Sequence, residues 1–168
     1  MHPTPNPFGR NFAQIAWVVP DIAAAEQFFQ DTLGVSGFRR LTVRAQEVEG
    51  TYHGKPGDYE FQLSLAYANG WMLELIQHVS GHSIYKDFLD QHAGGGVHHV
   101  ACAVPEAEFE QAVEPLVARG HSVVQAMRLP VARVAYLDTS RELGVLAEVI
   151  GVTAAGVDLL EQLKRDAM

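Results

Sequence analysis

An internal repeat constrains the fold of this chain more than any other feature of its sequence. The first copy opens with QIAWVVPDIAAAEQFF at 14–29 and the second with HVACAVPEAEFEQAVE at 99–114. In each copy an apolar strand pattern leads into a proline, an acidic residue and a helical pattern, as is typical where a helix begins. Each helical pattern ends at a glycine, Gly34 or Gly120, which indicates a helix C-terminus. The chain is therefore predicted to contain two modules of the same topology.

The two copies also close alike. WMLELI at 71–76 is echoed by GVLAEVI at 144–150, and each is a short apolar strand interrupted by one carboxylate, Glu74 or Glu148. Between helix and closing strand each copy has room for two more strands, near 37–48 and 59–67 in the first and near 121–127 and 132–138 in the second. The unit is thus β-α-β-β-β, and we expect an α+β protein.

The remaining segments connect or flank the modules. SIYKDFLDQH at 83–92 has the spacing of an amphipathic helix with Ser83 as its N-cap, and AGGG at 93–96 ends it. The turn-rich segment 46–58 lengthens the first copy. We expect one structural domain made of a disordered lead-in (1–11), a first module (12–78), a linker helix and glycine loop (79–96), a second module (97–151) and a C-terminal helix (152–168).

Composition excludes several classes of partner. The 168 residues are 48% apolar and 19% charged, which is typical of a folded globular chain. A formal net charge of −8 argues against nucleic acid and against an anionic membrane as partners. The lone Cys102 cannot form an internal disulfide, so a cytoplasmic location is the expectation. A small-molecule substrate is the expected partner because of the polar residues described next.

Four polar residues occupy repeat-related positions within the apolar strands: Gln14, Glu74, His99 and Glu148. A polar group buried alone carries a desolvation cost, so each needs a partner. Two carboxylates, a neutral imidazole and an amide oxygen suit a borderline divalent cation, whose charge the two carboxylates balance. The sequence therefore predicts a metal site built from these four residues, with coordination positions left for water or substrate.

Strand alternation selects between the adjacent His98 and His99. Neighbouring side chains on a strand point to opposite faces, so only one of the two can face the metal. The repeat aligns His99 with Gln14, and small alanines follow both residues on the same face, which would leave an open pocket. His98 is then expected to point the other way, towards the helix layer or the sheet rim, and to have a structural role.

These motifs resemble the vicinal oxygen chelate superfamily, also called the glyoxalase, bleomycin-resistance and extradiol-dioxygenase superfamily. The likeness covers roughly residues 12–151 and is strongest to methylmalonyl-CoA epimerases, through FAQIAWVVPDIAAAEQFF, LELIQ, SIYKDFLDQHAGGGVHHVACAV and YLDTSRELGVLAEVI. It implies two βαβββ modules in a cup-shaped mixed sheet, a glyoxalase-like half-barrel with outer helices. The epimerase usually has histidine where this chain has Gln14, and the set Gln, Glu, His, Glu instead looks like zinc-type glyoxalase I.

The resemblance implies a metal-dependent isomerase, epimerase or lyase. Such an enzyme takes a proton from the carbon next to a carbonyl or acyl-thioester, through a metal-bound enediolate. The metal would be Zn, Co, Ni, Mn or Fe(II), Glu148 would be the first base, and Glu60, on a polar stripe with Gln62 and Ser64, would be the second. That stripe faces either the pocket or solvent. A homodimer is also compatible with this fold.

Several alternatives remain open at this level. The chain could be a metal-free binding protein of the bleomycin-resistance kind or an extradiol-type dioxygenase, although the ligand types disfavour the latter. Arg39, Arg40 and Arg44 are either a local patch for coenzyme A or ordinary solvated charges. Four further residues either reach the substrate or lie at the surface: Tyr52, His53, Arg133 and Tyr136.

Overall fold

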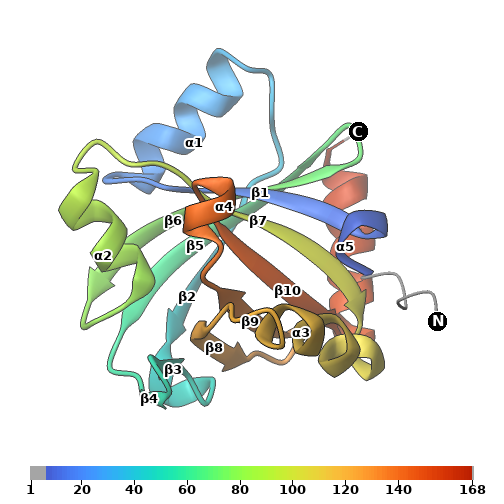
Figure 1. Cartoon of the computed structure of the whole chain (residues 1–168). Coiled ribbons are helices and arrows are strands. Elements are labelled where there is room, and N and C mark those ends of the chain that lie inside the picture. Colours follow the sequence, from blue (N-terminus) through green and yellow to red (C-terminus); the bar gives the residue numbers. More distant parts are fainter. Residues whose placement is uncertain (1–6, 168) are drawn as a thin grey trace.

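One curled sheet organises the part of the chain that the structure describes, residues 7–167. The computed structural model places ten strands in this sheet, in the order β2-β5-β6-β1-β7-β10-β9-β8-β3-β4 (Figure 1). The first module supplies β1 (Phe12–Val18), β2 (Arg39–Arg44), β3 (Thr51–Tyr52), β4 (Lys55–Pro56), β5 (Glu60–Ala68) and β6 (Trp71–Ser80). The second supplies β7 (Gly96–Pro105), β8 (Val123–Arg128), β9 (Ala132–Leu137) and β10 (Leu146–Val152).

The centre of the sheet joins the two modules. β1 and β7 pair antiparallel, and each also pairs in parallel with the closing strand of its own module, β6 or β10. The opening and closing strands of both modules therefore lie side by side. The prediction of an α+β fold with two βαβββ modules in a cup-shaped mixed sheet is confirmed.

The helices follow the capping signals of the sequence. Asp21 is the N-cap of α1 (Ile22–Asp31), Ser83 is the N-cap of α2 (Ile84–Gln91) and Thr153 is the N-cap of α5 (Ala154–Asp166). In the second module a short 3-10 turn at Glu106–Glu108 precedes α3 (Phe109–Val117), so this helix begins later than the repeat suggests. α4 (Ser140–Leu143) is a single turn that the sequence did not reveal. Across residues 7–167, no helix has the length and apolar character needed to span a membrane.

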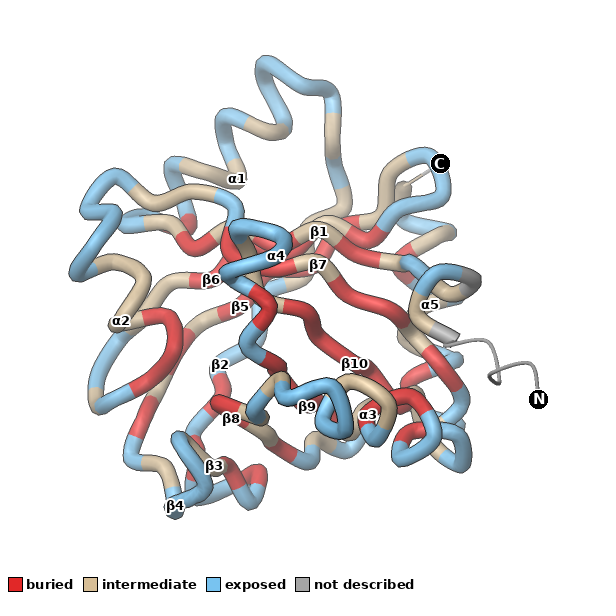
Figure 2. The backbone as a smooth tube through the Cα atoms, viewed as in Figure 1, coloured by how far each residue is buried: buried red, intermediate tan, exposed pale blue. Residues whose placement is uncertain are grey.

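The sheet has an apolar core on each face. On the outer face of the second module, α3 packs Phe109, Ala112 and Val113 against strand residues such as Cys102. On the inner face a larger cluster draws residues from strands of both modules and includes Leu163 of α5 and Tyr85 of α2. Figure 2 shows the central strands buried between elements whose outer sides are exposed. The inner face is therefore enclosed by helices from outside the repeated unit.

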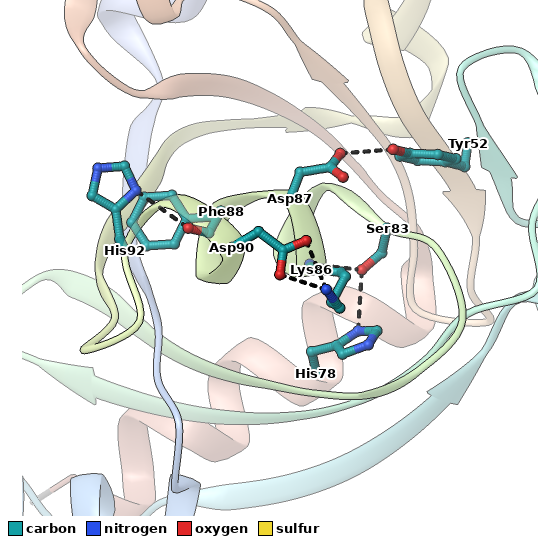
Figure 3. Close-up of polar contacts among 8 residues, drawn as sticks. All are labelled: Tyr52, His78, Ser83, Lys86, Asp87, Phe88, Asp90 and His92. Atoms are coloured by element: carbon teal, nitrogen blue, oxygen red, sulfur yellow. Dashed lines mark hydrogen bonds and ion pairs between the residues drawn. The ribbon is translucent and has the colours of Figure 1, made fainter.

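The long connection of the first module adds a hairpin to the second. β3 pairs with β8 as well as with β4, so residues that follow β2 extend the far edge of the sheet. The hydroxyl of Tyr52 donates to Asp87 of α2 at 2.7 Å, which ties the hairpin to the linker helix (Figure 3). The sequence predicted only a turn-rich loop here. The chain thus passes directly from β2 at one edge of the sheet to β3 and β4 at the other edge, and this connection helps to close the cup.

The predicted disordered lead-in lies partly outside the described residues, because the structure describes nothing before residue 7. Within residues 7–11 the chain is ordered, and Pro7–Arg10 forms a 3-10 turn. Phe8 packs against the outer core, and the backbone N–H of Ala103 donates to the carbonyl of Asn11 at 2.9 Å. In the structure this short stretch therefore contacts the second module, while the disordered lead-in as a whole stays a prediction.

The glycine loop before β7 provides a test of this fold. Gly95 has φ +77°, and a Cβ at this position would lie 2.4 Å from the carbonyl oxygen of Val18 on β1. We expect Gly95→Ala to lower the free energy of unfolding by about 2 kcal/mol or more, measured by urea denaturation. Gly94→Ala is the matched control, because a Cβ there meets nothing within 4 Å. Equal losses in the two variants would contradict this prediction.

Candidate functional site

The four repeat-related polar residues meet on the inner face of the sheet. They come from the four central strands, and all are buried: Gln14 on β1, Glu74 on β6, His99 on β7 and Glu148 on β10. Nε2 of His99 lies 3.1 Å from Oε2 of Glu74 and 3.1 Å from Oε2 of Glu148. Nε2 of Gln14 lies 3.0 Å and 3.3 Å from the same two oxygens, and 3.4 Å from Nε2 of His99. Residues far apart in the sequence thus present one side-chain atom each to a common point.

A β-bulge places both adjacent histidines in the interior. Ala16 of β1 faces His99 and the next residue, Trp17, faces Val97, so His98 is the extra residue on β7. A bulge of this kind interrupts strict alternation and redirects side chains. His98 is 3% exposed, and its Nδ1 lies 2.8 Å from Nδ1 of His99. His98 thus contacts His99 instead of turning fully away from it, while its ring packs against Tyr85 and Phe88 of α2, on the side of the linker helix. Its structural role stays a prediction.

Burial and charge together set the protonation of the cluster. Burial raises the pKa of Glu74, and the contacts with His99 and Gln14 offset only part of this effect. Burial alone would lower the pKa of His99, but the neighbouring Glu148 and Glu74 carboxylates raise it to about 9. Without a metal, the His99 imidazolium is thus the cation that stands between the carboxylates.

The donor set fits a divalent metal ion. Among the described residues, Glu74, His99 and Glu148 form one buried group whose possible ligand atoms all lie within 4.8 Å of one another. With metal–ligand bonds of about 2.1 Å, neighbouring donor atoms are about 3.0 Å apart in octahedral and about 3.4 Å apart in tetrahedral coordination. The separations of 3.0–3.4 Å within this cluster lie in that range. Gln14 can present its amide oxygen at the same position after a half-turn of the amide.

The cluster borders an apolar cavity of about 90 Å³. Gln14, Glu74 and Glu148 form part of its lining, which otherwise consists mainly of apolar side chains from both modules and from α5. Tyr136 of β9 also lines the cavity, and its hydroxyl accepts a hydrogen bond from Tyr85 at 3.0 Å. Burial raises the pKa of both phenols well above the usual value, so both remain protonated.

The structure does not place Glu60 in this cavity, which corrects its prediction as the second base. The apolar residues Phe61, Leu63 and Leu65 of β5 line the cavity instead. The Glu60 side chain is 30% exposed, and its carboxylate lies 3.1 Å from Nε of Arg44. The polar stripe on β5 thus faces away from the cavity, and the apolar alternate residues face into it.

The structure also shows where the other candidate residues lie. Arg133 lies on the outer face, where it pairs with Glu110 at 2.6 Å and stacks over the Phe109 ring. Tyr52 and His53 do not line the cavity, whereas Tyr136 does. Tyr85 is a further residue near the site that was not predicted from the sequence. The available signal was its place on the amphipathic linker helix, one turn before Phe88 and Leu89.

The family of this chain is identified by comparison with known protein families. The profile of the Glyoxalase/Bleomycin resistance protein/Dioxygenase superfamily matches residues 13–136. The chain belongs to this superfamily. A search of the curated proteins finds no match to the sequence.

Solved structures show the same fold. Methylmalonyl-CoA epimerase from Mycobacterium tuberculosis superposes with a TM-score of 0.64 at 18% identity, covering 88% of this chain and 91% of that one. A Streptomyces coelicolor methylmalonyl-CoA epimerase in complex with 2-nitronate-propionyl-CoA gives a TM-score of 0.56 at 22% identity, covering 88% of this chain and 96% of that one. A hypothetical protein from Bacillus halodurans C-125 gives 0.58 at 21% identity, with coverages of 83% and 91%. The likeness is one of fold, and the expected similarity to epimerase structures is confirmed at that level.

The raised pKa of His99 predicts how the metal-free protein responds to pH. The pKa of His99 is about 9 in the folded state and about 6.5 in the unfolded state. The protonated His99 therefore contributes fully to the free energy of unfolding below pH 6.5, and this contribution is lost as pH rises through 9. Urea denaturation in the presence of a chelator should show this decline in the wild type. His99→Ala should lack the decline and should unfold more easily at pH 7, by about 3 kcal/mol. Parallel pH profiles for the two proteins would disprove this assignment.

Proposed function

We propose that this protein is a divalent-metal-dependent isomerase or epimerase, or a lyase with the same first step, that removes a proton next to a carbonyl group. The observation that supports this most is the convergence of Gln14, Glu74, His99 and Glu148 at the wall of an apolar cavity. A divalent ion bound there would act as a Lewis acid on a carbonyl oxygen. Membership of the superfamily and the fold shared with methylmalonyl-CoA epimerases agree with this reaction class.

Glu148 is the proposed base. Its carboxylate borders the cavity, where it can reach a carbon atom held beside the cluster. It is paired across the sheet with Tyr136, whose hydroxyl accepts from Tyr85 and therefore keeps its own proton available. We propose that Tyr136 donates a hydrogen bond to the substrate oxygen, which would steady the charge that develops there.

The apolar lining has two roles in this proposal. It excludes water from the cavity, so the electrostatic interactions of the cluster are stronger than in solution. It also keeps the carboxylates in surroundings that penalise uncompensated charge, which favours uptake of a cation. Both roles depend on the enclosure of the inner face by α2 and α5.

A metal-free small-molecule binding protein is the second candidate, and the apolar cavity favours it. The buried carboxylates count against it, because a purely apolar ligand would leave their charge compensated only by His99. An extradiol-type dioxygenase is less well supported, because the cluster supplies one histidine with two carboxylates rather than two histidines with one.

Metal binding is the decisive test of the proposal. Equilibrium dialysis against Zn²⁺, Co²⁺ or Mn²⁺, followed by elemental analysis, should give one ion per chain for the wild type. His99→Ala should lose it, because removal of the imidazole leaves an incomplete donor set. His121→Ala serves as the control, since His121 lies outside the cluster and its ring Nδ1 is 2.9 Å from the backbone carbonyl of Asp138. Absence of a stoichiometric ion in the wild type would leave the binding-protein alternative.

A second prediction concerns His98. Its hydrogen bond to Nδ1 of His99 fixes the orientation of that ring, so that Nε2 faces the two carboxylates. Loss of such a partner of a metal-binding histidine lowers metal affinity about 10- to 100-fold. We therefore expect His98→Ala to bind metal with reduced affinity and unchanged stoichiometry in calorimetric titration. Wild-type affinity in this variant would show that the hydrogen bond has no role in metal binding.

A further inference from the structure

The composition of the cavity wall limits the kind of substrate that it can hold. Among the described residues that line the cavity, the polar side chains are Gln14, Glu74, Tyr136 and Glu148, and none is a lysine, arginine or histidine. Beyond the cluster the wall is apolar, so a charged group placed there would be buried without a partner. The body of a ligand that fills this space must therefore be uncharged.

The nearby basic side chains are already neutralised. Each of the three arginines of β2 is paired with a carboxylate: Arg39 with Asp166 at 2.6 Å, Arg40 with Glu26 at 2.7 Å and Arg44 with Glu60 at 3.1 Å. Single surface pairs contribute little to stability, but they lower the positive potential that a phosphate group would meet. This strand therefore offers no free cationic patch for the phosphates of a coenzyme A carrier.

The C-terminal helix forms the outer wall of the cavity. Leu159, Leu160 and Leu163 of α5 line it, and Leu163 is 1% exposed. The side chain of Thr153 caps the first turn of the helix, and Asp166 in the last turn bonds to Arg39 of β2. The helix is thus fixed at both ends across the cavity.

The volume of the cavity indicates the size of the group that it can hold. An apolar protein cavity of about 150 Å³ holds one benzene molecule. A cavity of about 90 Å³ therefore suits a group on the scale of one small ring or a short chain. We infer that the substrate is a small, uncharged, apolar carbonyl compound such as a cyclic or short-chain ketone, and that α5 limits its size. This inference rests on the proposed function, because it names the substrate class of the same site.

Binding of ketones to the metal-loaded protein tests the substrate class. Cyclohexanone lies within the stated size, 2-decalone exceeds it, and methylmalonyl-CoA represents an anionic acyl carrier. Calorimetric titration should show that cyclohexanone binds at least tenfold more tightly than either of the other two compounds. Tighter binding of methylmalonyl-CoA than of cyclohexanone would overturn the inference, and so would the absence of cyclohexanone binding.

Substitutions on α5 test its role as the wall. Leu160→Ala removes a half-buried side chain from the lining, so the ratio of 2-decalone to cyclohexanone affinity should rise at least fivefold. Leu160→Phe should lower the same ratio and weaken cyclohexanone binding. Val157→Ala is the matched control, because Val157 is 52% exposed on the same helix and does not line the cavity. An unchanged ratio in both Leu160 variants would show that α5 does not limit the ligand.

The two proposals can fail separately. Metal stoichiometry is measured without any ketone, so a missing ion overturns the proposed function whatever the ligand results are. If one ion binds and the ketones do not, only the substrate class is wrong. If ketones bind with the same affinity in the presence of a chelator, the cavity is a metal-independent binding site, which overturns the substrate role.

Discussion

Two carboxylates buried on the same face of one sheet are the constraint on which the rest of the site depends. Glu74 and Glu148 approach the same nitrogen of His99, and their mutual repulsion would be costly without a cation between them. In the metal-free protein the imidazolium supplies one positive charge. A divalent ion bound as proposed would supply two and would allow the imidazole to be a neutral ligand. Metal uptake would then release a proton from His99.

The repeat predicted the fold and the cluster because both depend on periodicity. Alternation along β1 and β7 assigned Gln14 and His99 to one face, and the symmetry of the modules added Glu74 and Glu148. The contact of His98 with His99 could not be predicted, because a bulge is a local insertion that leaves no periodic trace in one sequence. The hairpin that pairs with β8 was not predicted for a related reason. Its strands have two residues each, which is too short to show an alternation of polar and apolar residues.

Glu60 shows a different limit of sequence reasoning. On β5 the polar and the apolar residues alternate with equal regularity, so the pattern defines two faces without saying which one is enclosed. Elements outside the repeat determine which face of β5 is enclosed. α5 places its leucines over the inner face, so the apolar set of β5 turns towards the cavity and Glu60 remains at the edge beside Arg44. An α-helix that seemed only terminal in the sequence thus determines which residues can meet a substrate.

The internal symmetry also makes the differences between the modules informative. Glu74 and Glu148 occupy equivalent positions, yet Glu74 is paired across the sheet with Leu65 and Glu148 with Tyr136. An apolar neighbour gives the first carboxylate nothing to bind besides the cluster. A phenol beside the second offers a hydrogen-bond donor next to the same cavity. Equivalent backbone positions can therefore carry unequal chemistry, which agrees with the proposed roles, in which Glu74 would hold an ion and Glu148 would exchange a proton with the substrate beside Tyr136.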